Sequence, residues 1–109
     1  MISKYQRVQE ELAVGEKASM KVFGNSMLPL IKSGSLLSFK ACPEYEIGDI
    51  VFCKVKGHYI DAHKIKAKEQ LSKNKTAYLI SNNKGYENGW TTIIYGKVVE
   101  VNGERFQNN

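Results

Sequence analysis

Short runs of β-branched and aromatic residues, separated by turn signals, recur along most of this chain and constrain its fold more than any other feature. The runs cover residues 36–39, 50–55, 59–65, 76–80, 91–95 and 98–101. Gly57-His58 suits a two-residue hairpin that would place the 59–65 strand beside the 50–55 strand, and Asn102-Gly103 is another strong turn signal. With 109 residues, 42% of them hydrophobic, the chain can build one core but hardly two. We therefore predict a mainly β fold with a small, barrel-like core, and a loop over residues 82–88.

The N-terminal segment, residues 3–12, predicts one short helix. Ser3 is a suitable N-cap, and Gln6 three residues later completes a capping-box pattern. Apolar side chains follow at helical spacing, namely Tyr5, Val8 and Leu12. Gly15 should end this helix, which we expect to pack over the sheet.

The segment Gly24-Asn25-Ser26-Met27-Leu28-Pro29 places a hydroxyl residue between a flexible lead-in and a rigid proline. A hydroxyl presented in this way can act as a nucleophile if a neighbouring base removes its proton. The candidate base is His63, which lies in the predicted strand 59–65. Ser26 and His63 are therefore the candidate catalytic residues.

The order of these motifs resembles the LexA-like repressor and signal peptidase superfamily of serine peptidases (S24 and S26 types). The resemblance runs from about Val22 to Val101 and rests on Gly24-Asn25-Ser26-Met27, Gly48-Asp49-Ile50-Val51 and His63-Lys64-Ile65. Segments near the C-terminus also look like the closing hairpin of soluble members: residues 82–85, 88–90 and 94–99. The resemblance implies a LexA/signal-peptidase-like fold, with residues 1–21 as a helix and lead-in strand and residues 22–109 as a single peptidase-like domain.

In this superfamily the base is a lysine in LexA-like proteins and a histidine in one signal-peptidase branch, so His63 implies the Ser-His pattern. That branch also has a Gly-Asp-Asn segment whose aspartate supports the histidine, whereas this chain has Ile80-Ser81-Asn82 there. A third group normally fixes the imidazole tautomer and stabilises the imidazolium. Ser81 or Asn82 can accept a hydrogen bond from the ring, and Asp61, two residues before His63 on the same strand face, is a further candidate.

The resemblance implies a soluble serine endopeptidase-like protein with a peptide or protein substrate, bound with the help of Gly24, Asn25 and Met27. The chain segment from Gly15 to Ser26 is too short to reach back into the site without unpairing the lead-in strand, so we expect cleavage in trans. Only 23 residues precede Gly24, too few for a helix-turn-helix domain. A catalytically inactive peptide-binding protein is the main alternative, because the supporting aspartate is missing.

Charge and composition bear on the remaining classes of function. The formal net charge is +5, and alternation puts Lys64, Lys66 and Lys68 on one strand face, but no aromatic stacking pattern accompanies them, so nucleic-acid binding is the less favoured hypothesis. No apolar run reaches the roughly 20 residues of a membrane span, and the N-terminus does not resemble a secretory signal, which favours the cytoplasm. Cys42 and Cys53 are expected to be free thiols. No metal site or cofactor is predicted, and the oligomeric state is left open.

Overall fold

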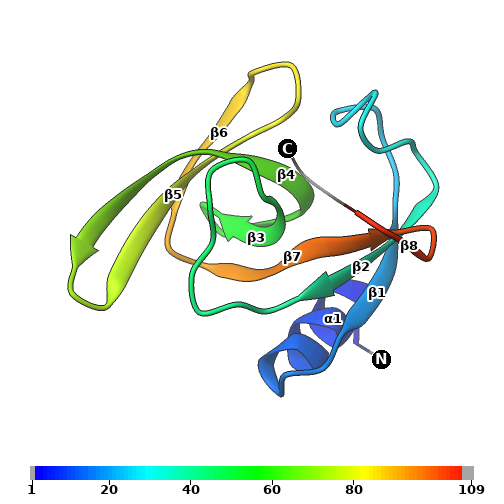
Figure 1. Cartoon of the computed structure of the whole chain (residues 1–109), viewed down its shortest axis with the longest axis horizontal. Helices are drawn as coiled ribbons and strands as arrows, with labels where there is room; N and C mark the ends of the chain where they lie inside the picture. Colours follow the sequence, from blue (N-terminus) through cyan, green and yellow to red (C-terminus); the bar gives the residue numbers. More distant parts are fainter. Residues whose placement is uncertain (1, 107–109) are drawn as a thin grey trace.

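One antiparallel sheet carries most of the chain in the computed structural model, which describes residues 2–106. The elements in chain order are α1 (Lys4–Ala13), β1 (Ala18–Val22), β2 (Ser35–Lys40), β3 (Ile50–Val55), β4 (His58–Ser72), β5 (Lys75–Ser81), β6 (Glu87–Thr91), β7 (Ile94–Val101) and β8 (Glu104–Arg105). In Figure 1 the long hairpin of β4 and β5 extends to one side, and α1 lies below β1 and β2. The prediction of a mainly β fold with one short helix is confirmed.

The strands follow the order β1-β2-β7-β3-β4-β5-β6, with β8 paired to β7. Within residues 2–106, β1 and β6 form the two ends of this order and do not pair with each other, so the sheet is open and the barrel-like core does not close. β4 changes neighbours along its length, since residues 58–64 pair with β3 and residues 64–72 pair with β5. The first half of β4 therefore has one unpaired edge.

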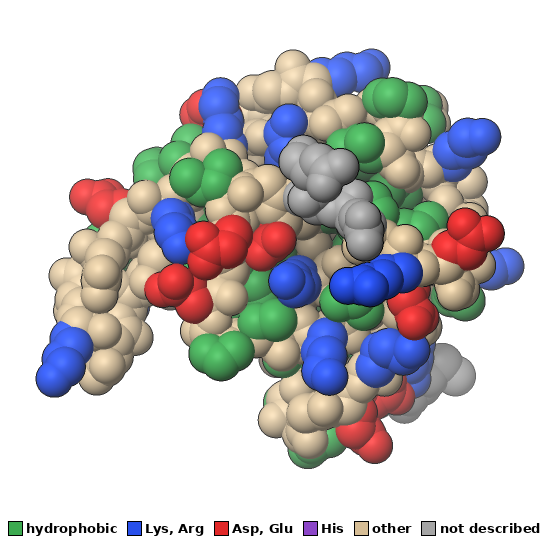
Figure 2. All heavy atoms as spheres, in the orientation of Figure 1, with side chains coloured by type: hydrophobic (Ala, Val, Ile, Leu, Met, Phe, Trp, Pro, Cys, Tyr) green, Lys and Arg blue, Asp and Glu red, His purple; other side chains and the backbone are tan. Residues whose placement is uncertain are grey.

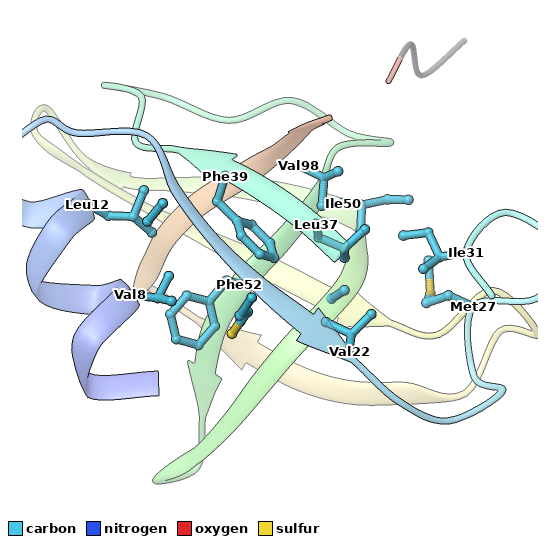
Figure 3. Packing of buried hydrophobic residues seen from close by; sticks show 13 residues of the cluster. Val8, Leu12, Val22, Met27, Ile31, Leu37, Phe39, Ile50, Phe52 and Val98 are labelled. Carbon is cyan, nitrogen blue, oxygen red and sulfur yellow. The ribbon is translucent and has the colours of Figure 1, made fainter. Parts of the chain in front are cut away.

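Hydrophobic side chains pack on both faces of the sheet, and β3 contributes to each. Ile50 and Phe52 join the cluster that also contains Leu37 and Phe39 of β2 (Figure 3), while alternate β3 residues pack against β5 on the other face. Period-two alternation sends successive side chains to opposite faces. A strand buried on both faces takes apolar residues at successive positions, which is why residues 50–53 are all apolar and buried.

The helix α1 forms as its sequence predicts. The Ser3 hydroxyl accepts a hydrogen bond from the backbone N–H of Gln6, and the Gln6 side chain accepts one from the backbone N–H of Ser3. Val8 and Leu12 are buried against the sheet, and both appear in the packed cluster of Figure 3. The capping box and the apolar spacing of the helix are thus confirmed.

The predicted β3–β4 turn and the predicted strand 91–95 were wrong. The β3–β4 hairpin turns at Lys56-Gly57, not at Gly57-His58, because Val55 pairs with His58 and both turn residues have positive φ (52° and 81°). This is the type I′ geometry, which takes glycine second and matches the twist of the flanking strands. The predicted strand 91–95 is divided, since Thr91 ends β6 and Ile94 begins β7. The Asn102-Gly103 turn lies between β7 and β8 as predicted.

Candidate active site

Ser26 lies in the connection between β1 and β2, which is the pale blue to cyan loop at the upper right of Figure 1. Gly24 has a φ of 107°, and its N–H donates to the Ser33 hydroxyl at 3.0 Å. Met27 is buried in the core, and its carbonyl accepts a hydrogen bond from the Ile31 N–H at 3.0 Å. The buried Met27 anchors this turn, so the half-buried Ser26 beside it has a defined position.

His63 is held by the backbone bonds of β4. It pairs with Val51 of β3, and two residues later the N–H of Ile65 donates to the Asp49 carbonyl at 2.9 Å. The Gly48 N–H in turn donates to the Ile65 carbonyl at 2.8 Å. The resulting position brings His63 Nε2 to 3.0 Å from Ser26 Oγ. The two candidate catalytic residues, 37 positions apart in the chain, are therefore within hydrogen-bond distance.

The other ring nitrogen of His63 contacts Asn88, a residue that the sequence did not single out for this role. His63 Nδ1 lies 2.7 Å from Asn88 Oδ1. An amide oxygen can only accept, so the proton of the neutral ring is on Nδ1 and Nε2 is free to accept from the Ser26 hydroxyl. This tautomer is the one that a histidine needs to take a proton from serine.

The sheet explains how Asn88 reaches His63. Lys64 pairs with Ser81 of β5, and Ser81 pairs with Glu87 of β6. β5 ends at Ser81, so no β5 residue pairs with His63. Asn88, the residue after Glu87 in β6, lies beside His63 instead. The predicted loop 82–88 placed Asn88 outside any strand, whereas it is the second residue of β6.

The residues expected to support the histidine make other contacts. The hydroxyl of the fully buried Ser81 donates to the Asn82 carbonyl, and Asn82 Oδ1 accepts from the backbone N–H groups of Lys84 and Tyr86. Asp61 lies near Tyr5 of α1. Burial raises the pKa of Tyr5, and the negative charge of Asp61 raises it further. The hydrogen bond to His63 Nδ1 that we expected from one of these residues is made by Asn88.

Asn83 is a second residue whose role at the site was not predicted. Its backbone N–H donates to the Ser26 carbonyl at 3.0 Å, and its side-chain amide donates to the Leu28 carbonyl at 2.9 Å. It therefore ties the β5–β6 loop to the serine turn. The available signal was the repetition of asparagine at 82, 83 and 88, since an amide side chain can donate and accept in one loop.

A shallow recess of about 10 Å³ lies beside Ser26. Gly24 and Met27, two of the three predicted substrate-binding residues, line it together with Asp61 and Ala62 of β4. Asn25 is exposed and does not line the recess, and its carbonyl accepts the Leu28 N–H. The free space next to Ser26 is therefore small.

The lysines of β4 are partly neutralised by glutamates. Lys66 Nζ lies 2.7 Å from Glu87, and Lys68 Nζ lies 3.1 Å from Glu46 and 3.4 Å from Glu44. The hydrogen bond to Glu46 raises the pKa of Lys68 above its usual range. Figure 2 likewise shows acidic side chains next to basic ones across one face of the molecule. These contacts do not strengthen the nucleic-acid hypothesis.

The remaining observations concern the described part of the chain, residues 2–106. No helix there has the length and apolar character to cross a membrane. No group of three or more His, Cys, Asp or Glu side chains in that range is arranged to hold a metal ion. Cys42 and Cys53 are free thiols in the structure.

The structure thus combines an open antiparallel sheet with a turn serine, Ser26, in contact with a strand histidine, His63. The Peptidase S24-like family model matches residues 2–103, and the chain belongs to this family. A comparison with curated proteins found no match. The resemblance noted from the order of the sequence motifs is thereby confirmed.

Proposed function

We propose that this protein is a serine endopeptidase that hydrolyses a peptide bond of another molecule through Ser26 and His63. The observation that carries the proposal is the contact series from Ser26 Oγ to His63 Nε2 at 3.0 Å and from His63 Nδ1 to Asn88 Oδ1 at 2.7 Å. Nucleophile, base and orienting group thus follow one another at hydrogen-bond distances, the arrangement that activates a hydroxyl. Family membership supports the same class of reaction.

In this mechanism Ser26 Oγ attacks the substrate carbonyl carbon while His63 Nε2 takes the hydroxyl proton. His63 then returns that proton to the leaving amine, and water hydrolyses the acyl-enzyme by the same steps in reverse. The Ser26 backbone N–H is the expected donor to the developing oxyanion. Asn88 keeps the ring in the required tautomer but, being neutral, supplies no charge to stabilise the imidazolium.

The substrate is expected to bind as an extended strand between β1 and the first half of β4. Each has one edge without a neighbouring strand. Ser26 lies in the loop that follows β1, and His63 lies near the end of the first half of β4. Backbone pairing along such edges gives affinity without requiring a particular sequence. The recess of about 10 Å³ favours Ala, Gly or Ser next to the cleaved bond.

A peptide-binding protein without turnover is the second candidate, and the neutral Asn88 is the observation that favours it. Replacing the triad aspartate by asparagine costs about 10⁴ in kcat in a serine protease, where the wrong tautomer results. Here the tautomer is suitable, so the expected loss of rate comes only from the missing negative charge.

A cytoplasmic location stays a prediction.

The test is to incubate the protein with a peptide mixture derived from a proteome digest and to read new chain ends by mass spectrometry. We expect cleavage next to small residues by the wild-type protein and a loss of at least about 10³ in rate for Ser26→Ala, because no other hydroxyl replaces the nucleophile. Ser72→Ala, which removes an exposed hydroxyl from the far end of β4, is the matched control and should cleave normally.

Persistent cleavage by Ser26→Ala would exclude Ser26 as the nucleophile. Peptide binding by the wild-type protein without new chain ends would instead establish the second candidate. Anisotropy with fluorescent peptides recovered from the mixture measures that binding.

A further inference from the structure

The helix α1 already occupies part of the β1 edge along which a peptide would pair. Arg7 Nη2 donates to the Ser19 carbonyl at 2.9 Å, and Lys4 Nζ donates to the Lys21 carbonyl at 2.8 Å. Residues two apart in a strand direct their backbone groups to the same edge. β1 pairs with β2 on its other side, so these two carbonyls belong to the edge next to the site.

The same helix also touches the beginning of β4. The Tyr59 hydroxyl donates to Gln9 Oε1 at 2.9 Å, and the rings of Tyr5 and Tyr59 stack with centroids 5.1 Å apart. α1 therefore contacts both β1 and the first half of β4, in the parts of these strands that lie farther from Ser26 and His63. Its position is fixed by the buried Val8 and Leu12, which join the sheet core.

The covered edge ends close to the catalytic pair. Phe23 directly follows β1, two residues after Lys21, and is 66% exposed. If the strand alternation continues by one residue, its backbone groups face the same edge. Lys4 Nζ lies 5.3 Å from the centre of the Phe23 ring, so the ammonium group stands at the boundary between the covered and the uncovered edge. Only the edge near Phe23 and Gly24 is left for a peptide on this side of Ser26.

We propose that Lys4 and Arg7 act as an end-stop that limits how far a peptide extends on one side of the reacting bond. This inference rests on the proposed binding of a peptide along the β1 and β4 edges. A peptide that pairs with Phe23 covers about three residues on that side, given the spacing of strand residues. Peptide residues beyond these meet the carbonyls of Lys21 and Ser19, which already accept hydrogen bonds from Lys4 and Arg7. Those peptide residues must therefore turn away from the β1 edge. The preferred substrate is thus a short peptide or a segment near a chain end.

The experiment uses two series of Ala-rich fluorescent peptides, built around a sequence bound by the wild-type protein. One series is lengthened residue by residue on the N-terminal side of the central bond, and the other on the C-terminal side. Affinities are measured in the Ser26→Ala background, which keeps the peptides intact. For the series that extends along β1, affinity should rise until about three residues have been added to that side of the central bond. Further residues should change the affinity by less than twofold.

The Lys4→Ala/Arg7→Ala double variant should remove this limit. The freed carbonyls of Ser19 and Lys21 then accept from the peptide backbone, and affinity should keep rising by about fivefold for each added hydrogen bond. Lys4→Met/Arg7→Met retains the aliphatic stems and serves as a second variant if the alanine protein is unstable. Lys17→Ala removes a positive charge that pairs with Glu100 instead, and it should keep the wild-type limit.

An identical length dependence in the wild-type and both double variants would overturn the end-stop while leaving peptide binding intact. If no peptide binds to any of the proteins, the proposed function and the end-stop both fail. If peptides bind with the expected limit but are never cleaved by the protein with Ser26 intact, hydrolysis fails and the end-stop stands.

Discussion

The proposed role of His63 as a base depends on Asn88, because the amide oxygen of Asn88 lies 2.7 Å from His63 Nδ1. Asn88→Ala should lower kcat/KM about tenfold or more, since the ring loses the acceptor that fixes its tautomer. Asn88→Asp should restore or exceed the wild-type kcat, because a carboxylate also stabilises the imidazolium. The same charge favours the protonated ring, so the acid limb of the pH–rate profile should move to higher pH.

The pH–rate profiles of the two variants separate this positioning role from a general loss of structure. Asn74→Ala and Asn74→Asp are the matched controls, because Asn74 is exposed in the β4–β5 turn. An unshifted acid limb in Asn88→Asp would contradict the role assigned to Asn88.

At the residue scale the sequence singled out Ser26 and His63, which lie in contact, but it did not predict which residue contacts the other ring nitrogen of His63. Ser26 and His63 belong to motifs with a local signature, whereas Asn88 acts from a strand whose register cannot be read from one sequence. A bulge between Ile80 and Ser81 shifts that register. A one-residue slip reverses which face a side chain occupies, so the contact between Asn88 and His63 could not be predicted from the sequence.

At the element scale, α1 and the sheet meet at Gly96 of β7. A Cβ atom there would lie 3.1 Å from Leu12 Cδ1 and 3.1 Å from the Lys40 backbone carbonyl oxygen. The backbone oxygen cannot move aside as a flexible side chain can, so Gly96→Ala should destabilise the protein by about 1–3 kcal/mol. Thermal unfolding followed by circular dichroism measures this loss as a lower Tm.

A double-mutant cycle with Leu12→Ala shows how much of the cost comes from the helix. Leu12→Ala alone should cost about 2–5 kcal/mol, and in combination the two changes should cost less than their sum because the trimmed side chain leaves room for the methyl group. Strict additivity would mean that the Lys40 backbone alone resists the methyl group. An unchanged Tm in Gly96→Ala would contradict the close packing itself.

Elements were predictable where one local signal sufficed. The capping box located α1, and Asn102-Gly103 located the last turn. The β3–β4 turn was placed one residue late because Lys56, with a φ of 52°, adopts a conformation that its side chain does not signal. Likewise, nothing in residues 91–95 marks the bend that separates β6 from β7.

At the scale of the whole molecule, alternation and turn spacing predicted the fold class but did not predict that the sheet stays open. Closure depends on whether β1 meets a strand at the other end, which is a long-range property. The peptide is expected to bind between β1 and the first half of β4, and Lys4 and Arg7 of α1 cover the far part of the β1 edge. The proposed site thus depends on strand edges that this fold leaves without a neighbouring strand.

The two cysteines provide a probe of global stability, because they differ in burial. Cys53 is fully buried in β3, and burial, with a contribution from the charge of Asp61, raises its pKa from 9.0 to about 12. Such a shift lowers the thiolate fraction about a thousandfold at pH 8, and the thiolate is the form that reacts with alkylating reagents. In the native protein iodoacetamide should modify Cys42, which is only partly buried, and leave Cys53 intact.

Mass spectrometry of peptides from the labelled protein measures both rates, with Cys42→Ser as the control that isolates Cys53. Modification of Cys53 should begin only at urea concentrations that unfold the protein, since the core around β3 must open before the reagent can enter. Ser26→Ala should show the same protection, because it removes one oxygen from a turn that Met27 anchors. Equal rates for the two thiols without urea would mean that the core around β3 opens far more readily than its packing indicates.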